Sequence, residues 1–142
     1  MDTIPFKVIG LNVEKFELAE NPVIIEGNID VKTDFSFGVN TASQLVRCLI
    51  AYTYVYRGEG ILNMVYTCVF KIEDEAFGKM LQENKFVIEP FFSRYLATIN
   101  VGAARGEIHA RCEAVNNPLS RIVLPPINLV EALPEDIVIE LS

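Results

Sequence analysis

The chain has 142 residues, the size of one ordinary domain, and its hydrophobic content of 51% excludes intrinsic disorder. Its 12 basic and 19 acidic residues give a net charge of −7, which makes binding to a phosphate backbone unfavourable. No apolar run approaches the roughly 20 residues of a membrane-spanning helix, and residues 1–10 lack the basic start of a signal peptide. We therefore expect a cytoplasmic, single-domain protein, residues 1–142, that neither binds nucleic acid nor inserts into a membrane.

Apolar and polar residues alternate along four successive segments, a pattern typical of strands with one buried face. The alternation predicts strands over about residues 6–18, 22–39, 44–57 and 61–72. Pro22 marks the start of the second strand, because proline cannot donate a ladder hydrogen bond. Short connections favour antiparallel pairing of successive strands, so the four strands are predicted to form an antiparallel sheet.

The hydrophobic period changes to that of a helix after Ile72, which predicts helices over about residues 74–83, 88–115 and 128–133. The acidic run Glu73–Glu75 suits the positive end of the first helix dipole. A catalytic carboxylate cluster is the weaker interpretation of the same run. Together the elements predict an α+β fold, in which a four-stranded antiparallel sheet is followed by a long helix and a short C-terminal helix packed on one face.

The predicted long helix contains a stretch of small residues. Gly102 and Gly106 each cost about 1 kcal/mol relative to alanine in a helix interior. Their presence favours either close packing against a second backbone or a break in the helix. We take Gly102, Ala103 and Gly106 as candidate residues of an oligomer interface.

The sequence lacks the residues that most catalytic and metal sites need. His109 is the only histidine, so no second histidine can join it in a zinc site. There is no GxSxG elbow and no glycine-rich phosphate loop. Cys48, Cys68 and Cys112 lack metal-ligand spacing and fit free, buried thiols in a reducing cytoplasm. We therefore expect no enzymatic activity, no metal and no cofactor.

Aromatic residues concentrate on two of the predicted strands and at the start of the long helix. Tyrosine combines apolar area with a polar tip that tolerates water. A groove lined by tyrosine and phenylalanine at a sheet edge would therefore suit an extended peptide. The competing interpretation is that these rings form the core beneath the helix. The candidate peptide-binding residues are Phe35, Phe37, Tyr52, Tyr54, Phe86 and Phe92.

Three motifs in the second half of the chain are similar to those of one known family. Pro90-Phe91 opens the long helix, and Ala104-Arg105-Gly106 lies further along it. Leu124-Pro125-Pro126-Ile127-Asn128 follows and precedes Ala132-Leu133. With four long strands before the helices, this combination resembles the SecB family of protein-export chaperones. The motifs cover about residues 90–133, and the order of elements covers nearly the whole chain.

The resemblance implies an ATP-independent holdase that binds unfolded or precursor polypeptides in hydrophobic grooves and assembles as a homotetramer, a dimer of dimers. SecB-like proteins pass clients to the SecA motor through an acidic sheet face and a C-terminal tail, and some relatives instead protect the antitoxin of a toxin–antitoxin system. This chain ends at Ser142 without such a tail, and Glu14, Glu17 and Glu20 do not align cleanly with the docking acids. The partner, a SecA-like motor or an antitoxin, therefore stays open at this point.

Two functions of other classes fit the same elements. A hotdog-type thioesterase also packs a long helix against an antiparallel sheet, but it places that helix after the first strand. A carrier of small apolar ligands would use the aromatic groove for a lipid-like molecule. Turnover of acyl thioesters would indicate the first function, and a ligand retained through purification would indicate the second.

Overall fold

Four long strands form the main sheet of the computed structural model, which describes residues 4–20, 29–121 and 126–141. The strands are β1 (Phe6–Leu18), β2 (Asp30–Asn40), β3 (Leu45–Tyr56) and β4 (Glu59–Ile72). They pair antiparallel in the order β1-β4-β3-β2. The first part of the strand predicted from residue 22 lies outside the described residues, as do Leu124 and Pro125 of the proline motif.

The position of β1 differs from the sequence prediction. Successive strands pair between β2 and β3 and between β3 and β4, but β1 pairs with β4 instead of β2. Its register runs from Phe6 opposite Ile72 to Leu18 opposite Leu62. Periodic alternation reports which face of a strand is buried but carries no information on which strand lies beside it. The sheet therefore has β1 at one edge and β2 at the other.

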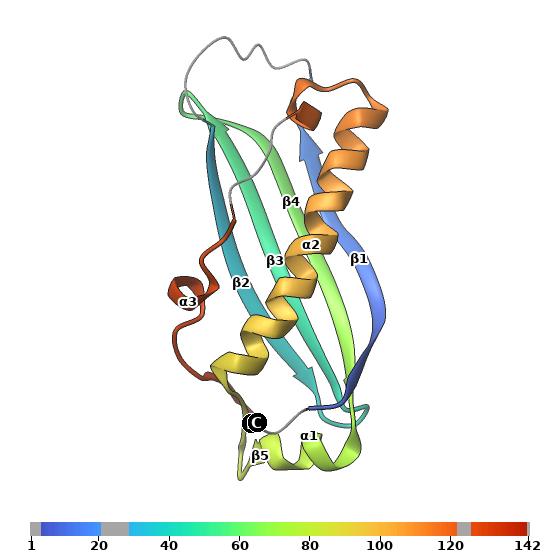
Figure 1. Ribbon diagram of the computed structural model, residues 1–142, viewed down its shortest axis with the longest axis vertical. Coiled ribbons are helices and arrows are strands. Elements are labelled where there is room, and N and C mark those ends of the chain that lie inside the picture. Colours follow the sequence, from blue (N-terminus) through green and yellow to red (C-terminus); the bar gives the residue numbers. More distant parts are fainter. Residues whose placement is uncertain (1–3, 21–28, 122–125, 142) are drawn as a thin grey trace.

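The helices lie on one face of this sheet, as Figure 1 shows for the long helix α2 (Pro90–Ala114), which crosses the strands diagonally. The other helical elements are α1 (Asp74–Met80), the 3₁₀ turn η1 (Pro118–Arg121) and α3 (Leu129–Ala132). This arrangement confirms the predicted α+β fold with a long and a short C-terminal helix on one face. Side chains of α2 at helical spacing enter the core against β3 and β4, among them Phe92, Leu96, Asn100, Ala104, Ile108 and Cys112.

A second, three-stranded sheet was not predicted from the sequence. It consists of β5 (Leu81–Gln82), β6 (Lys85–Ile88) and β7 (Ile137–Glu140), in the order β5-β6-β7. The helix predicted over residues 74–83 ends earlier, at Met80, because Leu81 is already extended. Pairing of β7 with β6 brings the C-terminal end of the chain beside the start of α2 (Figure 1).

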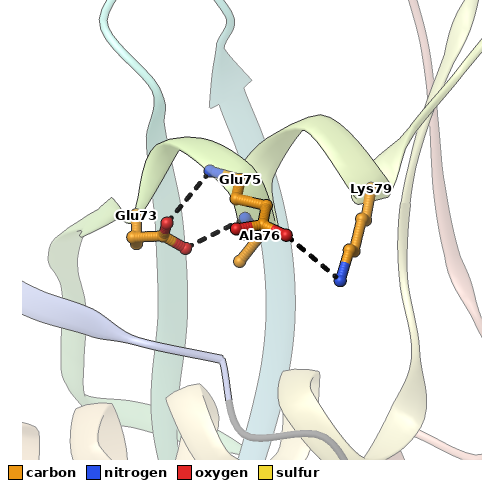
Figure 2. Close-up of polar contacts among 4 residues, drawn as sticks. All are labelled: Glu73, Glu75, Ala76 and Lys79. Atoms are coloured by element: carbon orange, nitrogen blue, oxygen red, sulfur yellow. Dashed lines mark hydrogen bonds and ion pairs between the residues drawn. The ribbon is translucent and has the colours of Figure 1, made fainter.

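The acidic run before α1 forms the cap of that helix. The Glu73 carboxylate accepts hydrogen bonds from the backbone N–H of Glu75 at 3.2 Å and of Ala76 at 3.1 Å (Figure 2). Glu75 in turn lies 3.8 Å from the ammonium of Lys79, one helical turn further on. Glu73 thus satisfies two of the backbone donors that every helix leaves open at its N-terminus.

Candidate functional site

Apolar side chains are exposed together on the starts of β1 and α2. Val8, Leu11, Phe91 and Tyr95, which we call the β1–α2 patch, keep between 36% and 58% of their surface exposed. A shift of register between Val8 and Gly10 allows Val8 and Leu11 to lie opposite Phe70 and Cys68, on the side of the sheet that carries α2. The Phe6 ring links the two elements, since it lies 5.6 Å from the Phe92 ring and 5.7 Å from the Tyr95 ring. A surface of this kind on a protein of net charge −7 is suited to contact another polypeptide.

The glycines of α2 continue the outward face of the helix. No atom outside the immediate helix lies within 4 Å of the position that a Cβ would take at Gly102 or Gly106. Ala103 between them is half-buried. The helix is continuous from Pro90 to Ala114, so the glycines do not break it. Within the described chain nothing packs closely against them to compensate for their cost in helix stability.

Tyr52 and Tyr54 lie in the core beneath α2, with each side chain only 1% exposed. Their rings meet edge to face with centroids 6.4 Å apart. Burial raises the pKa of the Tyr52 hydroxyl, and the Arg105 guanidinium partly offsets this rise. Burial also raises the pKa of Tyr54. In this conformation neither ring presents a surface to a peptide.

Phe86 and Phe92 are buried as well, in a different part of the core. Phe86 on β6 packs against Phe77 of α1 with ring centroids 4.8 Å apart. Phe92 occupies the first turn of α2 and contacts Phe6. These two rings hold α1 and the start of α2 in place, so the competing interpretation, core beneath the helix, describes their environment in this structure.

Phe35 and Phe37 differ from the other nominated aromatics because they are half-exposed. Both lie on β2, opposite Ile50 and Cys48 of β3, and they pack against the edge of the core. The other side of β2 is an edge of the main sheet, and β7 approaches it. The structure thus places two of the six nominated side chains where a polypeptide can reach them.

A buried polar cluster in the centre of the core was missed from the sequence. Cys48 and Cys68 lie opposite each other on β3 and β4, and Asn100 of α2 reaches both. The Asn100 amide donates to the Cys48 carbonyl at 2.9 Å, and the Cys68 thiol donates to the Asn100 oxygen at 3.2 Å. Burial raises the pKa of Cys48 to about 12 and that of Cys68 to about 11. Such protonated thiols are poor nucleophiles, so the cluster has a structural role. The sequence signal that could have revealed this cluster is a polar residue, Asn100, at a position of the long helix that faces the sheet.

The described residues contain no group of three or more histidine, cysteine or acidic side chains arranged to hold a metal ion. None of the described helices combines the length and the apolar character needed to cross a membrane. His109 is exposed on α2, where its ring lies 2.9 Å from Glu113 and 3.0 Å from the Ser120 carbonyl. These contacts join η1 to the end of α2 and leave the histidine with a local structural role.

No protein-family model matches the sequence, and no curated protein matches it. The fold is similar to that of a SecB-like chaperone from Mycobacterium tuberculosis, whose structure was determined in complex with a ChAD peptide from the HigA1 antitoxin. The TM-score is 0.56 at 13% sequence identity, and the match covers 87% of this chain and 90% of that one. The resemblance drawn from the sequence motifs is therefore confirmed at the level of the fold, which is SecB-like.

Proposed function

We propose that this chain is an ATP-independent chaperone, a holdase, that binds unfolded or precursor polypeptides on its exposed apolar surface. The observation that carries the proposal is the SecB-like fold, shared along 87% of the chain with a chaperone determined with a bound peptide. The exposed β1–α2 patch and the half-exposed rings of Phe35 and Phe37 supply apolar area for a client. The net charge of −7 keeps a protein with such a surface from aggregating by itself.

The proposed client surface follows β2 at the edge of the main sheet, where no described strand pairs with β2 on the side away from β3, although β7 approaches it. An edge strand offers unpaired backbone groups to an extended segment, and this pairing tolerates many sequences. Phe35 and Phe37 would add apolar contacts beside that edge. Tyr52, Tyr54, Phe86 and Phe92 would contribute only in a conformation that lifts the elements covering them, and otherwise support the surface from below.

The test is the aggregation of a chemically unfolded client, followed by light scattering without nucleotide. The wild-type chain should suppress aggregation, and Phe37→Ala should suppress it less at equal concentration of folded protein. Phe77→Leu, a change in the core away from β2, is the matched control and should leave the suppression unchanged. If the wild type fails with several clients at several-fold molar excess, or if it hydrolyses acyl thioesters, the holdase proposal is wrong.

The proposed assembly is a homotetramer, a dimer of dimers, in which Gly102, Ala103 and Gly106 of α2 meet a second subunit. The open space at both glycines supports this contact. Light scattering of the purified protein should give the mass of four chains. Gly102→Glu should lower that mass, whereas Gly78→Glu, at a helical glycine of α1 with equally open surroundings, should not. A wild-type protein that is monomeric at micromolar concentration would contradict the assembly.

Two cellular roles are candidates for this proposed chaperone. The antitoxin peptide bound to the structurally similar chaperone favours a role beside a toxin–antitoxin pair, in the cytoplasm. Export through a SecA-like motor is the alternative. Co-expression with the product of a neighbouring antitoxin gene should keep that product soluble if the first route is correct. Stable complex formation with a SecA motor, and none with the antitoxin, would favour the second.

A further inference from the structure

The face of the main sheet opposite α2 has no described helix packed on it (Figure 1). Alternate side chains of the two central strands point to this outer face, because their neighbours along each strand are buried against α2. Six half-buried apolar residues of the central strands lie on this outer face, namely Leu45, Leu49, Ala51, Val55, Val65 and Val69. The polar residues Thr53, Asn63 and the buried Thr67 lie among them. This mixed, largely apolar surface is available to a partner.

Positive charge is concentrated at one end of the outer face. Lys7 of β1 lies directly opposite Lys71 of β4, and Arg47 of β3 lies opposite Val69 on the same side of the sheet. Like charges that face each other across a strand pair destabilise a sheet. The ion pairs formed by the described residues involve none of these three cations, and the Lys71 ammonium donates a hydrogen bond to the Ser43 carbonyl at 2.6 Å. This local excess is notable in a chain with a net charge of −7.

Two carboxylates lie near this end of the face, but neither forms an ion pair with Lys7, Arg47 or Lys71. Glu73 and Asp74 border Lys7 and Lys71 beyond the end of the sheet, but Glu73 is engaged as the cap of α1. At the other end of the face, by contrast, the charges are mixed. Lys15 is paired with Glu17 at 2.9 Å, and Lys32 alternates along β2 with carboxylates.

Arg47 is exposed, and its guanidinium reaches across to the neighbouring strand β2. Its Nη2 and Nε atoms lie 3.5 Å and 3.6 Å from the position that a Cβ would take at Gly38 on the neighbouring strand. The absence of a side chain at Gly38 leaves a shallow hollow of about 310 Å³, which Leu45 and Val69 also line. A guanidinium beside aliphatic side chains matches a carboxylate that is carried next to an apolar side chain.

We infer that the Lys7–Arg47–Lys71 end of the outer face docks an acidic segment of a partner polypeptide, with apolar side chains of that segment on the central strands. Charge complementarity selects this occupant over the chain's own unfolded clients, which would contact the apolar surface on the α2 side. The surface is therefore separate from the one in the proposed function, and either can fail without the other.

The probe for this surface is a fluorescein-labelled 12-residue peptide of alternating glutamate and leucine, and binding is followed by fluorescence anisotropy. The wild-type protein should bind it, with an affinity that falls between 50 mM and 500 mM salt. Reversing two cations in the double variant Lys7→Glu with Arg47→Glu should weaken binding by about tenfold or more, because the change removes two charge pairs and adds repulsion. The milder variant Arg47→Gln serves as a second test in case the double variant folds poorly. It should also weaken binding, but by less.

Lys32→Glu is the matched control, because it reverses a charge on the same face at the end where charges are mixed. It should change the affinity by less than about twofold, consistent with a screened exposed site. Holdase activity of the double variant should equal that of the wild type. Equal binding by wild type and Arg47 variants would overturn the inference. A change in the native mass of the double variant would also overturn it, because the occupant would then be a second copy of this chain.

Discussion

Replacing Asn100 by alanine should lower the free energy of unfolding by about 3 kcal/mol. The side chain is fully buried, and it joins α2 to both central strands through the Cys48 carbonyl and the Cys68 thiol. Each of these two hydrogen bonds contributes about 1 kcal/mol net, and the loss also leaves a buried carbonyl with one partner fewer. The space left by the amide, roughly 30 Å³, adds just under 1 kcal/mol.

Two further substitutions at this position separate the contributions. Asn100→Leu restores the volume without the hydrogen bonds, so it should cost less than the alanine substitution. Asn100→Asp keeps the shape but introduces a carboxyl group whose burial raises its pKa above the unfolded value of about 3.9. The unfolded state then loses its proton first, so the stability of this variant should fall as pH rises above about 4. Its deficit against the wild type should therefore be larger at pH 8 than at pH 5.

Urea unfolding at one fixed protein concentration provides the measurement, because assembly would make the midpoint concentration-dependent. Thr98→Ala is the matched control on the same helix: Thr98 is exposed and bonds only to the Arg94 carbonyl within its own helix. That variant should stay within about 0.5 kcal/mol of the wild type. If Asn100→Ala unfolds at the same urea concentration as Thr98→Ala, the amide does not hold α2 on the sheet and the reasoning is refuted.

Four other outcomes follow from the structure. Tyr54→Ala should lower the free energy of unfolding by about 3–5 kcal/mol, because the ring is fully buried. Phe37→Ala, at the half-exposed edge of the sheet, should lower it clearly less. Equal losses in urea unfolding would contradict the assignment of Phe37 to the surface. Glu73→Ala should lower the free energy of unfolding by about 1 kcal/mol, because it removes the cap of α1. Glu75→Ala removes only an exposed ion pair and should lower it by less than about 0.5 kcal/mol. A thiol reagent at pH 8 should find Cys48, Cys68 and Cys112 unreactive until the protein unfolds and should then count three thiols, since all are free and buried. A disulfide found in the absence of reductant would argue against a cytoplasmic location of the protein. The pKa values of Cys48 and Cys68 rise from 9.0 to about 12 and about 11 in the folded state. Unfolded thiols would deprotonate first, so stability should be full below pH 9 and fall between pH 9 and pH 12.

The sequence was sufficient for the fold class because the strands are long and their alternation is regular. The inward row of β3 is buried along its whole length, as expected for a strand with one buried face, and it includes Tyr52 and Tyr54, which were nominated for peptide binding. The neighbours of β1 could not be predicted, since the same alternation would fit a partner at β2 or at β4. The small second sheet also escaped detection, because Leu81–Gln82 is too short for any period to show.

The sequence leaves the candidate site open, for a related reason. Aromatic composition marks side chains that need burial or a ligand, and the sequence alone does not distinguish the two. Of the six nominated side chains, Phe35 and Phe37 are half-exposed, whereas α2 covers Tyr52 and Tyr54. The most exposed member of the β1–α2 patch, Tyr95, was not among the six nominated side chains. Its exposure depends on the crossing position of α2, which is a tertiary property.

The strand order has a consequence for how the chain folds during synthesis. β2, β3 and β4 can pair in turn as soon as each is made, because the connections between them are short. β1 is synthesised first, yet its partner is the last of the four strands, with Phe6 opposite Ile72. Until β4 has left the ribosome, Val8 and Leu11 lie on a strand with no neighbour, exposed to other nascent chains. This protein therefore passes through the same unpaired, aggregation-prone state that it is proposed to shield in its clients.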